Sequence, residues 1–249
     1  MNDHVVIPDV HAKPGVNLSH MLWAGKYIAK HRPKRVIILG DLFDMASASR
    51  WTTSWLKAIK RYSLENDLKA GQTAINLLMK PWAKSYKPKL IFITGNHENR
   101  LNRLKEEMPV LCSSLPGYKT ILNKRGWKVI PFLRPYKLDG ILYCHYFVRN
   151  SSGQVTGSKH GMSSAIVQAK REMVSCIAGH KQGLDYAIVQ CHGKIIRSII
   201  AGSFYQHKEE YLTDQGNNHW HGILHLKNVK NGTYDLNELS IETLKKEYK

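Results

Sequence analysis

Short apolar runs rich in β-branched residues alternate with longer stretches of helical periodicity through the first half of the chain. The runs at 4–7, 35–39 and 90–94 are nearly continuous, which is typical of strands buried on both faces of a sheet. Apolar residues at helical spacing predict helices over 18–31 and 51–79, between these strands. This alternation of strand and helix favours an open, mainly parallel α/β sheet.

Proline and glycine set the expected helix boundaries. Pro33 closes the first helix, and the second is expected to be interrupted near Gly71. A third helix is predicted over 99–107, because helical spacing follows the third strand and Pro109 stops it.

The second half of the chain has a different pattern. Weaker strands are predicted at 128–131, 140–144 and 176–178, with a helix at 163–174. From about residue 186 the chain is β-rich, and four strands joined by turns are predicted at 187–190, 195–200, 222–229 and 233–241. The tail at 244–249 is charged and is expected to be frayed. No repeat or domain boundary is evident, so we expect a single domain over residues 1–249.

The composition is that of a folded domain with a substantial core, since 43% of the 249 residues are hydrophobic. No apolar stretch approaches the roughly 20 residues that a membrane span needs, and the first residues are typical of a strand rather than a signal peptide. The four cysteines are scattered without a CxxC pair. We therefore expect a cytoplasmic protein without membrane contact, and the sequence does not indicate its oligomeric state.

The charge is strongly basic. Lys and Arg number 37 against 19 Asp and Glu, which gives a formal net charge of +18. The excess is uneven, because residues 80–137 hold 13 Lys and Arg against three acids. Such a balance favours polyanionic partners through steering and counterion release, although a solvated basic surface would have the same composition. We therefore expect a nucleic acid or nucleotide as the substrate or partner.

Three polar motifs follow the first three predicted strands directly. They are Asp9-Val10-His11, Gly40-Asp41-Leu42-Phe43-Asp44 and Gly95-Asn96-His97-Glu98. Loops at the carboxyl ends of parallel strands gather at one edge of a sheet, so these side chains are expected to lie close together. Carboxylates, imidazoles and an amide form a ligand set for a pair of hard-to-borderline divalent metals.

Each motif also has a purely structural interpretation. Asp41 by itself is better explained as a helix N-cap, and Asn96 has an alternative explanation as a left-handed turn residue. His145 and His180 would each be an ordinary buried histidine if considered alone. Their shared placement at the ends of predicted strands favours the metal-ligand interpretation.

These three motifs, followed by His145 as the fourth and Gly179-His180 as the fifth, resemble in this order the calcineurin-like metallophosphoesterases over about residues 3–206. The resemblance implies an α/β fold of the four-layer αββα sandwich type, with a dinuclear site at one edge. Metal 1 would be bound by Asp9, His11 and Asp41, and the ligands implied for metal 2 are Asp41, Asn96, His145 and His180. Two divalent ions are expected, with Mn favoured by the oxygen-rich site and Fe, Zn, Ni or Co as alternatives.

The resemblance also implies a mechanism. A hydroxide shared by the two metals would attack phosphorus in line with the leaving oxygen. His97 would donate a proton to that oxygen or stabilise its charge, and Asp44 would hold the His97 imidazole in orientation.

The last motif departs from the family pattern. Many members have Gly-His-x-His, in which the second histidine completes metal 1, whereas this chain has Gly179-His180-Lys181-Gln182. The remaining ligand of metal 1 would then be either an oxygen of Gln182, which binds more weakly than histidine, or a water molecule. Lys181 either contacts a substrate phosphate or is a solvated surface lysine.

The fourth motif also departs. His145 is followed by Tyr146 rather than glycine, while His160-Gly161 matches the family dipeptide but lies at a predicted helix start. We assign His145 as the ligand and His160 as a candidate substrate contact, since anions are favoured at helix N-termini. Arg100, in the first turns of the helix after the third motif, either reaches a substrate phosphate or lies on a solvated face.

The protein phosphatase branch of the family places an arginine directly after the second motif, and this chain has Met45 there. Together with the basic charge, this favours a phosphodiesterase or nuclease acting on nucleic acid or a nucleotide. A phosphomonoesterase acting on phosphoproteins or small phosphates is the first alternative. An inactive scaffold that keeps the fold for binding is the second, and only Gln182 favours it.

Overall fold

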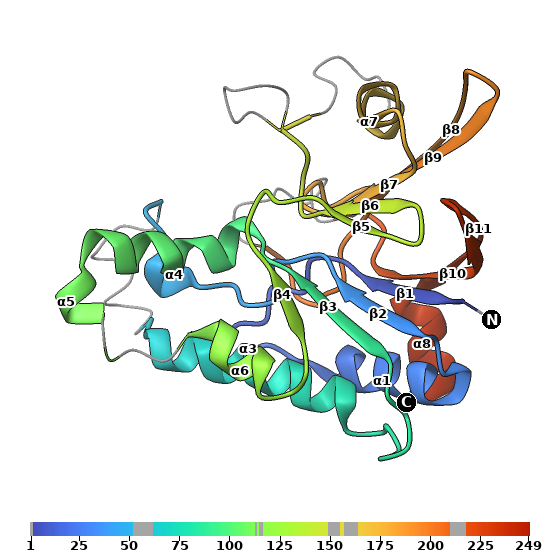
Figure 1. The fold of residues 1–249 in the computed structure, drawn as a ribbon. Helices are drawn as coiled ribbons and strands as arrows, with labels where there is room; N and C mark the ends of the chain where they lie inside the picture. Colours follow the sequence, from blue (N-terminus) through green and yellow to red (C-terminus); the bar gives the residue numbers. More distant parts are fainter. Residues whose placement is uncertain are drawn as a thin grey trace.

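The computed structural model describes residues 2–51, 62–112, 114, 117–148, 155–156, 164–209 and 218–249. Two β-sheets lie one above the other in this part of the chain, and helices cover their outer faces (Figure 1). His160 and residues 52–61 of the helix predicted over 51–79 lie outside the described residues.

The first sheet has six strands in the order β11-β10-β1-β2-β3-β4. Its strands are β1 His4–Ile7, β2 Arg35–Ile38, β3 Lys89–Ile93, β4 Lys128–Ile130, β10 Gly222–Lys230 and β11 Thr233–Ser240. Strands β1 to β4 are parallel, with Val5 opposite Val36, while β10 pairs with β1 in the antiparallel direction. The carboxyl ends of the parallel strands therefore meet at one edge, where the first three motifs follow.

The second sheet has five strands in the order β5-β6-β7-β9-β8. Its strands are β5 Tyr136–Leu138, β6 Ile141–Cys144, β7 Cys176–Ala178, β8 Leu184–Cys191 and β9 Lys194–Ala201. Strands β6, β7 and β9 are parallel to one another, and the edge strands β5 and β8 pair in the antiparallel direction. The short strand β5 was not predicted, because its sequence has no run of apolar residues.

Alternate residues of the central strands face the two sides of the first sheet. Val5 and Ile7 pack against helices, whereas Val6 belongs to the apolar layer between the sheets. That inner layer also holds Ile37 and Ile91 from the first sheet, and Ile177 from the second. Burial on both faces explains why these strands are almost continuously apolar.

Helices complete the outer layers. Those packed against the first sheet include α1 Ser19–His31, α3 Leu64–Met79, α6 Tyr118–Asn123 and α8 Ile241–Tyr248. Helix α7, Ser164–Glu172, covers the second sheet on the opposite side (Figure 1). The predicted four-layer αββα sandwich is thus confirmed. The remaining helical elements are η1 Ala46–Ala48, α4 Asn96–Glu107 and α5 Pro109–Cys112.

The predicted break near Gly71 is wrong, because α3 runs through this residue without interruption. A Cβ at Gly71 would collide with the ring of Phe43, so the glycine allows close packing rather than ending the helix. The helix begins at Leu64, where the Ser63 hydroxyl accepts a hydrogen bond from the N–H of Asn66. Trp51, expected at the start of this helix, is 91% exposed.

The prediction of a frayed tail is also wrong. Strand β11 ends at Ser240, whose side chain accepts a hydrogen bond from the N–H of Thr243 and so caps helix α8. Ile241 and Leu244 lie on one face of α8 and are buried in the core that includes α1. This apolar face stabilises the helix, although the charged residues of the segment led to the prediction of a frayed tail.

The third helix begins earlier than expected, at Asn96, so that Asn96 and His97 belong to its first turn. None of the helices in the described ranges is both long enough and apolar enough to cross a lipid bilayer.

Candidate metal centre

Residues from five separated motifs meet at the carboxyl edge of the two sheets. Asp9 and His11 follow β1, Asp41 follows β2, and the other residues placed there are Asn96 after β3, His145 after β6 and His180 after β7. Backbone hydrogen bonds tie the loops together, since His11 N donates to Asp41 O at 2.8 Å and Gly179 N to His145 O at 2.9 Å. The fold therefore brings together the strand-end residues that the sequence indicated.

One group of donor atoms comes from Asp41, His145 and His180, which each place a ligand atom within 4.8 Å of the others. The side-chain oxygen of Asn96 lies 2.8 Å from His145 Nε2 and 2.9 Å from His180 Nδ1. An Asp41 oxygen lies 3.3 Å from the same His145 nitrogen. These four residues are the ones that the family resemblance implied for metal 2.

The orientation of the His145 ring is fixed by a backbone contact. Its Nδ1 lies 2.8 Å from the carbonyl oxygen of Leu39, which can only accept, so Nδ1 carries the proton. Nε2 is thereby turned toward the oxygens of Asp41 and Asn96. A nitrogen lone pair facing two oxygens requires a positive charge between them, which a proton or a metal ion supplies.

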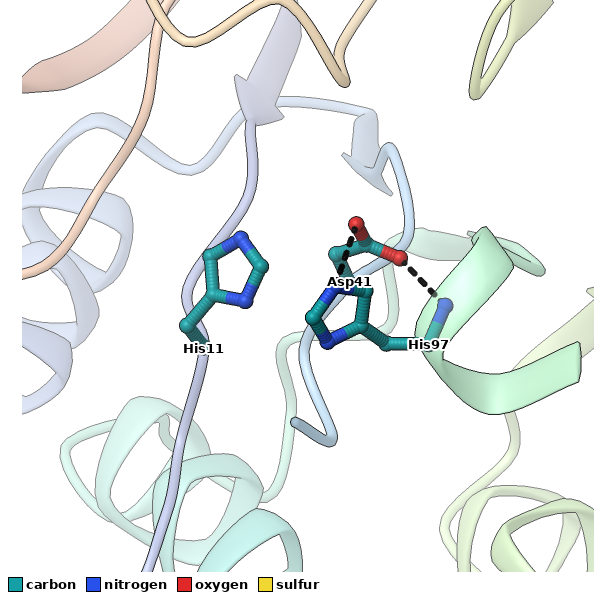
Figure 2. Close-up of side chains that lie close together, drawn as sticks. All are labelled: His11, Asp41 and His97. Atoms are coloured by element: carbon teal, nitrogen blue, oxygen red, sulfur yellow. Dashed lines mark hydrogen bonds and ion pairs between the residues drawn. The ribbon is translucent and has the colours of Figure 1, made fainter. Parts of the chain in front are cut away.

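A second group of donor atoms comes from His11, Asp41 and His97 (Figure 2). The N–H of His97 donates to Asp41 Oδ1 at 2.9 Å, and the His97 imidazole lies against the same carboxylate. Asp41 thus belongs to both groups, as expected of a carboxylate that bridges two ions.

Asp9 is fully buried beside these groups, but it does not belong to the donor groups found among the described residues. Its two carboxylate oxygens lie 3.1 and 3.0 Å from the backbone nitrogen of His180, which donates to them. A Cβ at Gly179 would lie 2.5 Å from Asp9 Oδ1, so glycine is needed for this close approach.

Asp44 contacts two imidazoles at once. Its Oδ1 lies 3.0 Å from Nδ1 of His11 and 3.0 Å from Nδ1 of His97. The backbone oxygen of Asp44 is a further acceptor for His97 Nδ1, at 2.8 Å. The contact between Asp44 and His97 that the sequence analysis expected is therefore present, and Asp44 orients His11 as well.

Arg100 reaches this site from α4. Its guanidinium nitrogens lie 3.0 Å from His97 Nε2 and 3.0 Å from the backbone oxygen of Asp44. Since Arg100 donates to Nε2, the His97 proton in this arrangement is on Nδ1. The interpretation of Arg100 as a residue of a solvated helix face does not fit these contacts.

Glu98 was quoted in the third motif without a role, and the structure gives it one. It is fully buried, with Oε2 accepting from Asp41 N at 3.0 Å and Gly95 N at 2.8 Å, and Oε1 from Phe43 N at 2.8 Å. Glu98 thus ties the loop that carries Asp41 to the start of α4. Burial and the charge of Asp41 raise the pKa of Glu98 to about 7, while the hydrogen bonds oppose this.

The backbone at three candidate ligands is strained. His11, Asp41 and His180 have φ values of 45°, 48° and 66°, in the left-handed region that residues with a side chain rarely adopt. Such conformations cost on the order of 1 kcal/mol or more each and persist where the surrounding structure requires them. Here they turn the side chains into the shared edge.

Burial and neighbouring charges shift the pKa values of the site histidines in opposite directions. Burial lowers the pKa of His11, but its hydrogen bond with Asp44 and the charge of Asp41 outweigh this and raise it to about 9. Burial likewise opposes protonation of His145, and the charges of Asp41 and Asp9 raise its pKa to about 9. His180 behaves differently, because burial and the charge of His145 lower its pKa to about 4.

The pKa values of two site carboxylates are shifted downward. Burial raises the pKa of Asp41 and of Asp44, but neighbouring histidines hold both well below their usual range. Asp41 and Asp44 are therefore ionised, and their charges raise the pKa values of His11 and His145. Divalent cations would replace the protons of these histidines as the positive charge, so the residues present fit a dinuclear site.

Gln182 and Lys181, the remaining candidates in the described residues, lie outside the donor groups. Gln182 Nε2 lies 3.4 Å from His11 Nε2, and Gln182 Oε1 accepts from the hydroxyl of Tyr205 at 2.6 Å. The ammonium of Lys181 donates to Ser164 Oγ at the first residue of α7, at 2.9 Å. Gln182 thus lies at the His11 side of the site, and Lys181 is directed toward α7.

Sequence reasoning missed one charged residue altogether. Glu209 is buried, and one of its carboxylate oxygens belongs to a third donor group with His11 and Asp44. It follows β9 by several residues and does not end a strand, so the rule that located the other candidates could not locate it. Its position within a polar, charged stretch gave no other signal.

The two packed sheets and the strand-end donors define a metallophosphoesterase-like α/β protein. The chain belongs to the calcineurin-like phosphoesterase family, whose model matches residues 5–199. Membership supports a metal-dependent phosphoesterase in general, with a dinuclear divalent metal site as is usual in the family.

Similar solved structures include Chaetomium thermophilum Vps29, which is 10% identical, with 96% of this chain and 97% of that chain covered and a TM-score of 0.44. GAP50, described as the anchor in the inner membrane complex of Plasmodium, is 12% identical, with coverages of 96% and 84% and a TM-score of 0.39. Among curated proteins, none matches this chain.

Proposed function

We propose that this protein hydrolyses phosphodiester bonds in a nucleic acid or nucleotide, using two divalent metal ions. The observation that carries the proposal is that Asp41 belongs to two donor groups, and that one of these groups includes His97, whose Nδ1 contacts Asp44. Metal ligands and a proton donor for the leaving group are thereby supported by the same edge of the sheets.

The two ions would share Asp41 and differ in their other protein ligands. Asp9 and His11 would complete the first set, as the family resemblance implies, and Asn96, His145 and His180 would complete the second. When bound, the ions would supply an activated water and neutralise the phosphate oxygens. We favour Mn²⁺ because carboxylate and amide oxygens accompany the imidazoles.

His97, oriented by Asp44, would protonate the leaving group. Asp44 accepts from Nδ1 of His97 and so orients the ring, whose Nε2 would donate a proton to the departing oxygen. Arg100, now 3.0 Å from that Nε2, would turn its guanidinium to a phosphate oxygen.

The substrate class rests on charge. A net charge of +18 favours polyanions, and 13 of the 37 basic residues lie in residues 80–137, which include the start of α4 at the site. For a nucleic acid, affinity should fall steeply as salt rises, because each phosphate contact releases counterions.

The test compares Mn²⁺-dependent cleavage of a fluorescent single-stranded DNA with turnover of bis-p-nitrophenyl phosphate and p-nitrophenyl phosphate. We expect DNA and diester cleavage that is lost in Asp41→Asn and His97→Ala. Matched controls are Asp235→Asn on β11 and His192→Ala in the β8–β9 turn, both exposed and remote from the motifs. Absence of turnover with any divalent metal would favour the binding scaffold.

A phosphomonoesterase is the second candidate, and the position of Arg100 favours it. A guanidinium beside His97 suits the two negative charges of a monoester phosphate, and it would serve in place of the arginine absent after Asp44. Turnover of the monoester alone in the same assay would establish this candidate instead.

A further inference from the structure

Glu209 lies beyond residue 199, where the match to the family ends, yet it reaches the metal centre. Its side chain is 3% exposed, and one carboxylate oxygen lies within 4.8 Å of donor atoms of both His11 and Asp44. Within the described part of the chain, it is the one member of these donor groups that comes from outside the five motifs.

Gln182 does not present an oxygen at this position in the structure. Its Oε1 accepts from the Tyr205 hydroxyl at 2.6 Å, and its amide nitrogen faces His11 Nε2 at 3.4 Å. The residue that replaces the family's second histidine therefore turns N–H groups toward His11. Glu209 adds a carboxylate oxygen at this side of His11, where Gln182 presents its amide nitrogen.

Lys13 shows that a cation already binds this carboxylate. Its ammonium lies 2.9 Å from Glu209 Oε1 and 2.8 Å from Oε2, and His207 Nε2 lies 2.8 Å from Oε1. The side chain of Lys13 is 22% exposed, so it can turn toward solvent while Glu209 stays buried. A divalent ion beside His11 would compete with Lys13 for the same oxygens.

We propose that Glu209 is a ligand of the metal ion bound beside His11, and that Lys13 competes with that ion. This inference rests on the proposed metal-dependent function and adds a residue that the family motifs do not contain. A purely structural ion pair between Lys13 and Glu209 would have the same burial and distances, so the test must separate the two roles.

The two roles predict opposite effects of removing Lys13. If Glu209 binds the metal, Glu209→Gln weakens Mn²⁺ binding, whereas Lys13→Met frees the carboxylate and strengthens it. If the pair only supports the loops, both variants disturb the same contact and change Mn²⁺ binding in the same direction.

The experiment measures Mn²⁺ binding to the full chain by isothermal titration calorimetry. The matched controls are Glu65→Gln and Lys69→Met, an exposed pair on α3 with 2.7 Å between Nζ and Oε1. They change the net charge equally without touching the site. The double variant Lys13→Met/Glu209→Gln removes both members of the ion pair, and its thermal unfolding in EDTA shows whether it folds.

We expect Glu209→Gln and the double variant to lose at least about fivefold in affinity at one of two Mn²⁺ sites. Lys13→Met should gain affinity, and both controls should match the unaltered chain. A smaller loss in Glu209→Gln, or a loss in Lys13→Met, would overturn the assignment of Glu209. If the unaltered chain bound no Mn²⁺, the proposed function itself would fail.

Discussion

Asp44 Oδ1 lies 3.0 Å from Nδ1 of both His11 and His97, so one carboxylate orients two imidazoles with different proposed tasks. His11 would present Nε2 to a metal, and His97 would present Nε2 to the leaving oxygen. A hydrogen bond from the far nitrogen fixes the orientation of each ring and raises its basicity. At the scale of single residues, Asp44 therefore supports both the proposed metal ligand His11 and the proposed proton donor His97.

Asp44→Asn should lower kcat for diester hydrolysis by about 100-fold or more, because the His97 ring loses the carboxylate that orients it. Mn²⁺ affinity should also fall by about tenfold, since His11 loses its orienting carboxylate. Steady-state kinetics and calorimetry on the same protein preparation measure both effects. The exposed substitution Asp235→Asn is the control, and a kcat in Asp44→Asn equal to that of this control would contradict the account.

At the scale of elements, the strand ends were predictable and the supporting contacts were not. Continuous apolar runs identify β1, β2 and β3, and the polar residues after them had to meet at one edge. The three hydrogen bonds that Glu98 accepts depend on loops that exist only in the folded chain. Helix α8 could have been predicted from the sequence, because Ser240 is a favourable N-cap residue and Ile241 and Leu244 have helical spacing.

The position of Glu209 could not be predicted, since its approach to His11 depends on how the chain turns after β9. Gly71 was misread for a similar reason. Its function is set by the Phe43 ring, which comes from the loop after β2 and lies far away in the sequence. Close packing between distant segments leaves no periodic signal in the sequence.

Gly71→Ala should destabilise the fold, although alanine is the better helix former by about 1 kcal/mol. The added methyl group would collide with the Phe43 ring, and overpacking of this kind costs about 1–3 kcal/mol. Urea unfolding in EDTA measures the change in the free energy of unfolding. Gly183→Ala is the control, because a Cβ there meets no atom within 4 Å. A Gly71→Ala variant more stable than the unaltered chain would disprove this explanation.

At the scale of the whole molecule, buried histidines outside the metal centre make stability depend on pH. His20 is fully buried, and burial together with the charge of His207 lowers its pKa to about 3. His4 and His225 are also lowered, to about 4, again chiefly by burial. Below the unfolded pKa of about 6.5, the unfolded chain takes up protons that the folded chain excludes.

The free energy of unfolding should therefore fall as the pH is lowered from about 6.5 toward 4. His20→Gln should reduce this slope by up to about 1.4 kcal/mol per pH unit, the contribution of one proton. Urea titrations in EDTA at several pH values give the slope, and the exposed His192→Gln serves as the control. An unchanged slope in His20→Gln would show that His20 is not excluded from protonation by the fold.

A dinuclear metal centre bridged by Asp41 should hydrolyse phosphodiesters. The most direct test follows Mn²⁺ stoichiometry and bis-p-nitrophenyl phosphate hydrolysis in the same samples of the unaltered chain and of Asp41→Asn. We predict two ions per chain and hydrolysis that EDTA abolishes, with both ion binding and rate strongly reduced in Asp41→Asn. Hydrolysis that persists in EDTA, or an Asp41→Asn variant with unchanged stoichiometry and rate, would contradict the account.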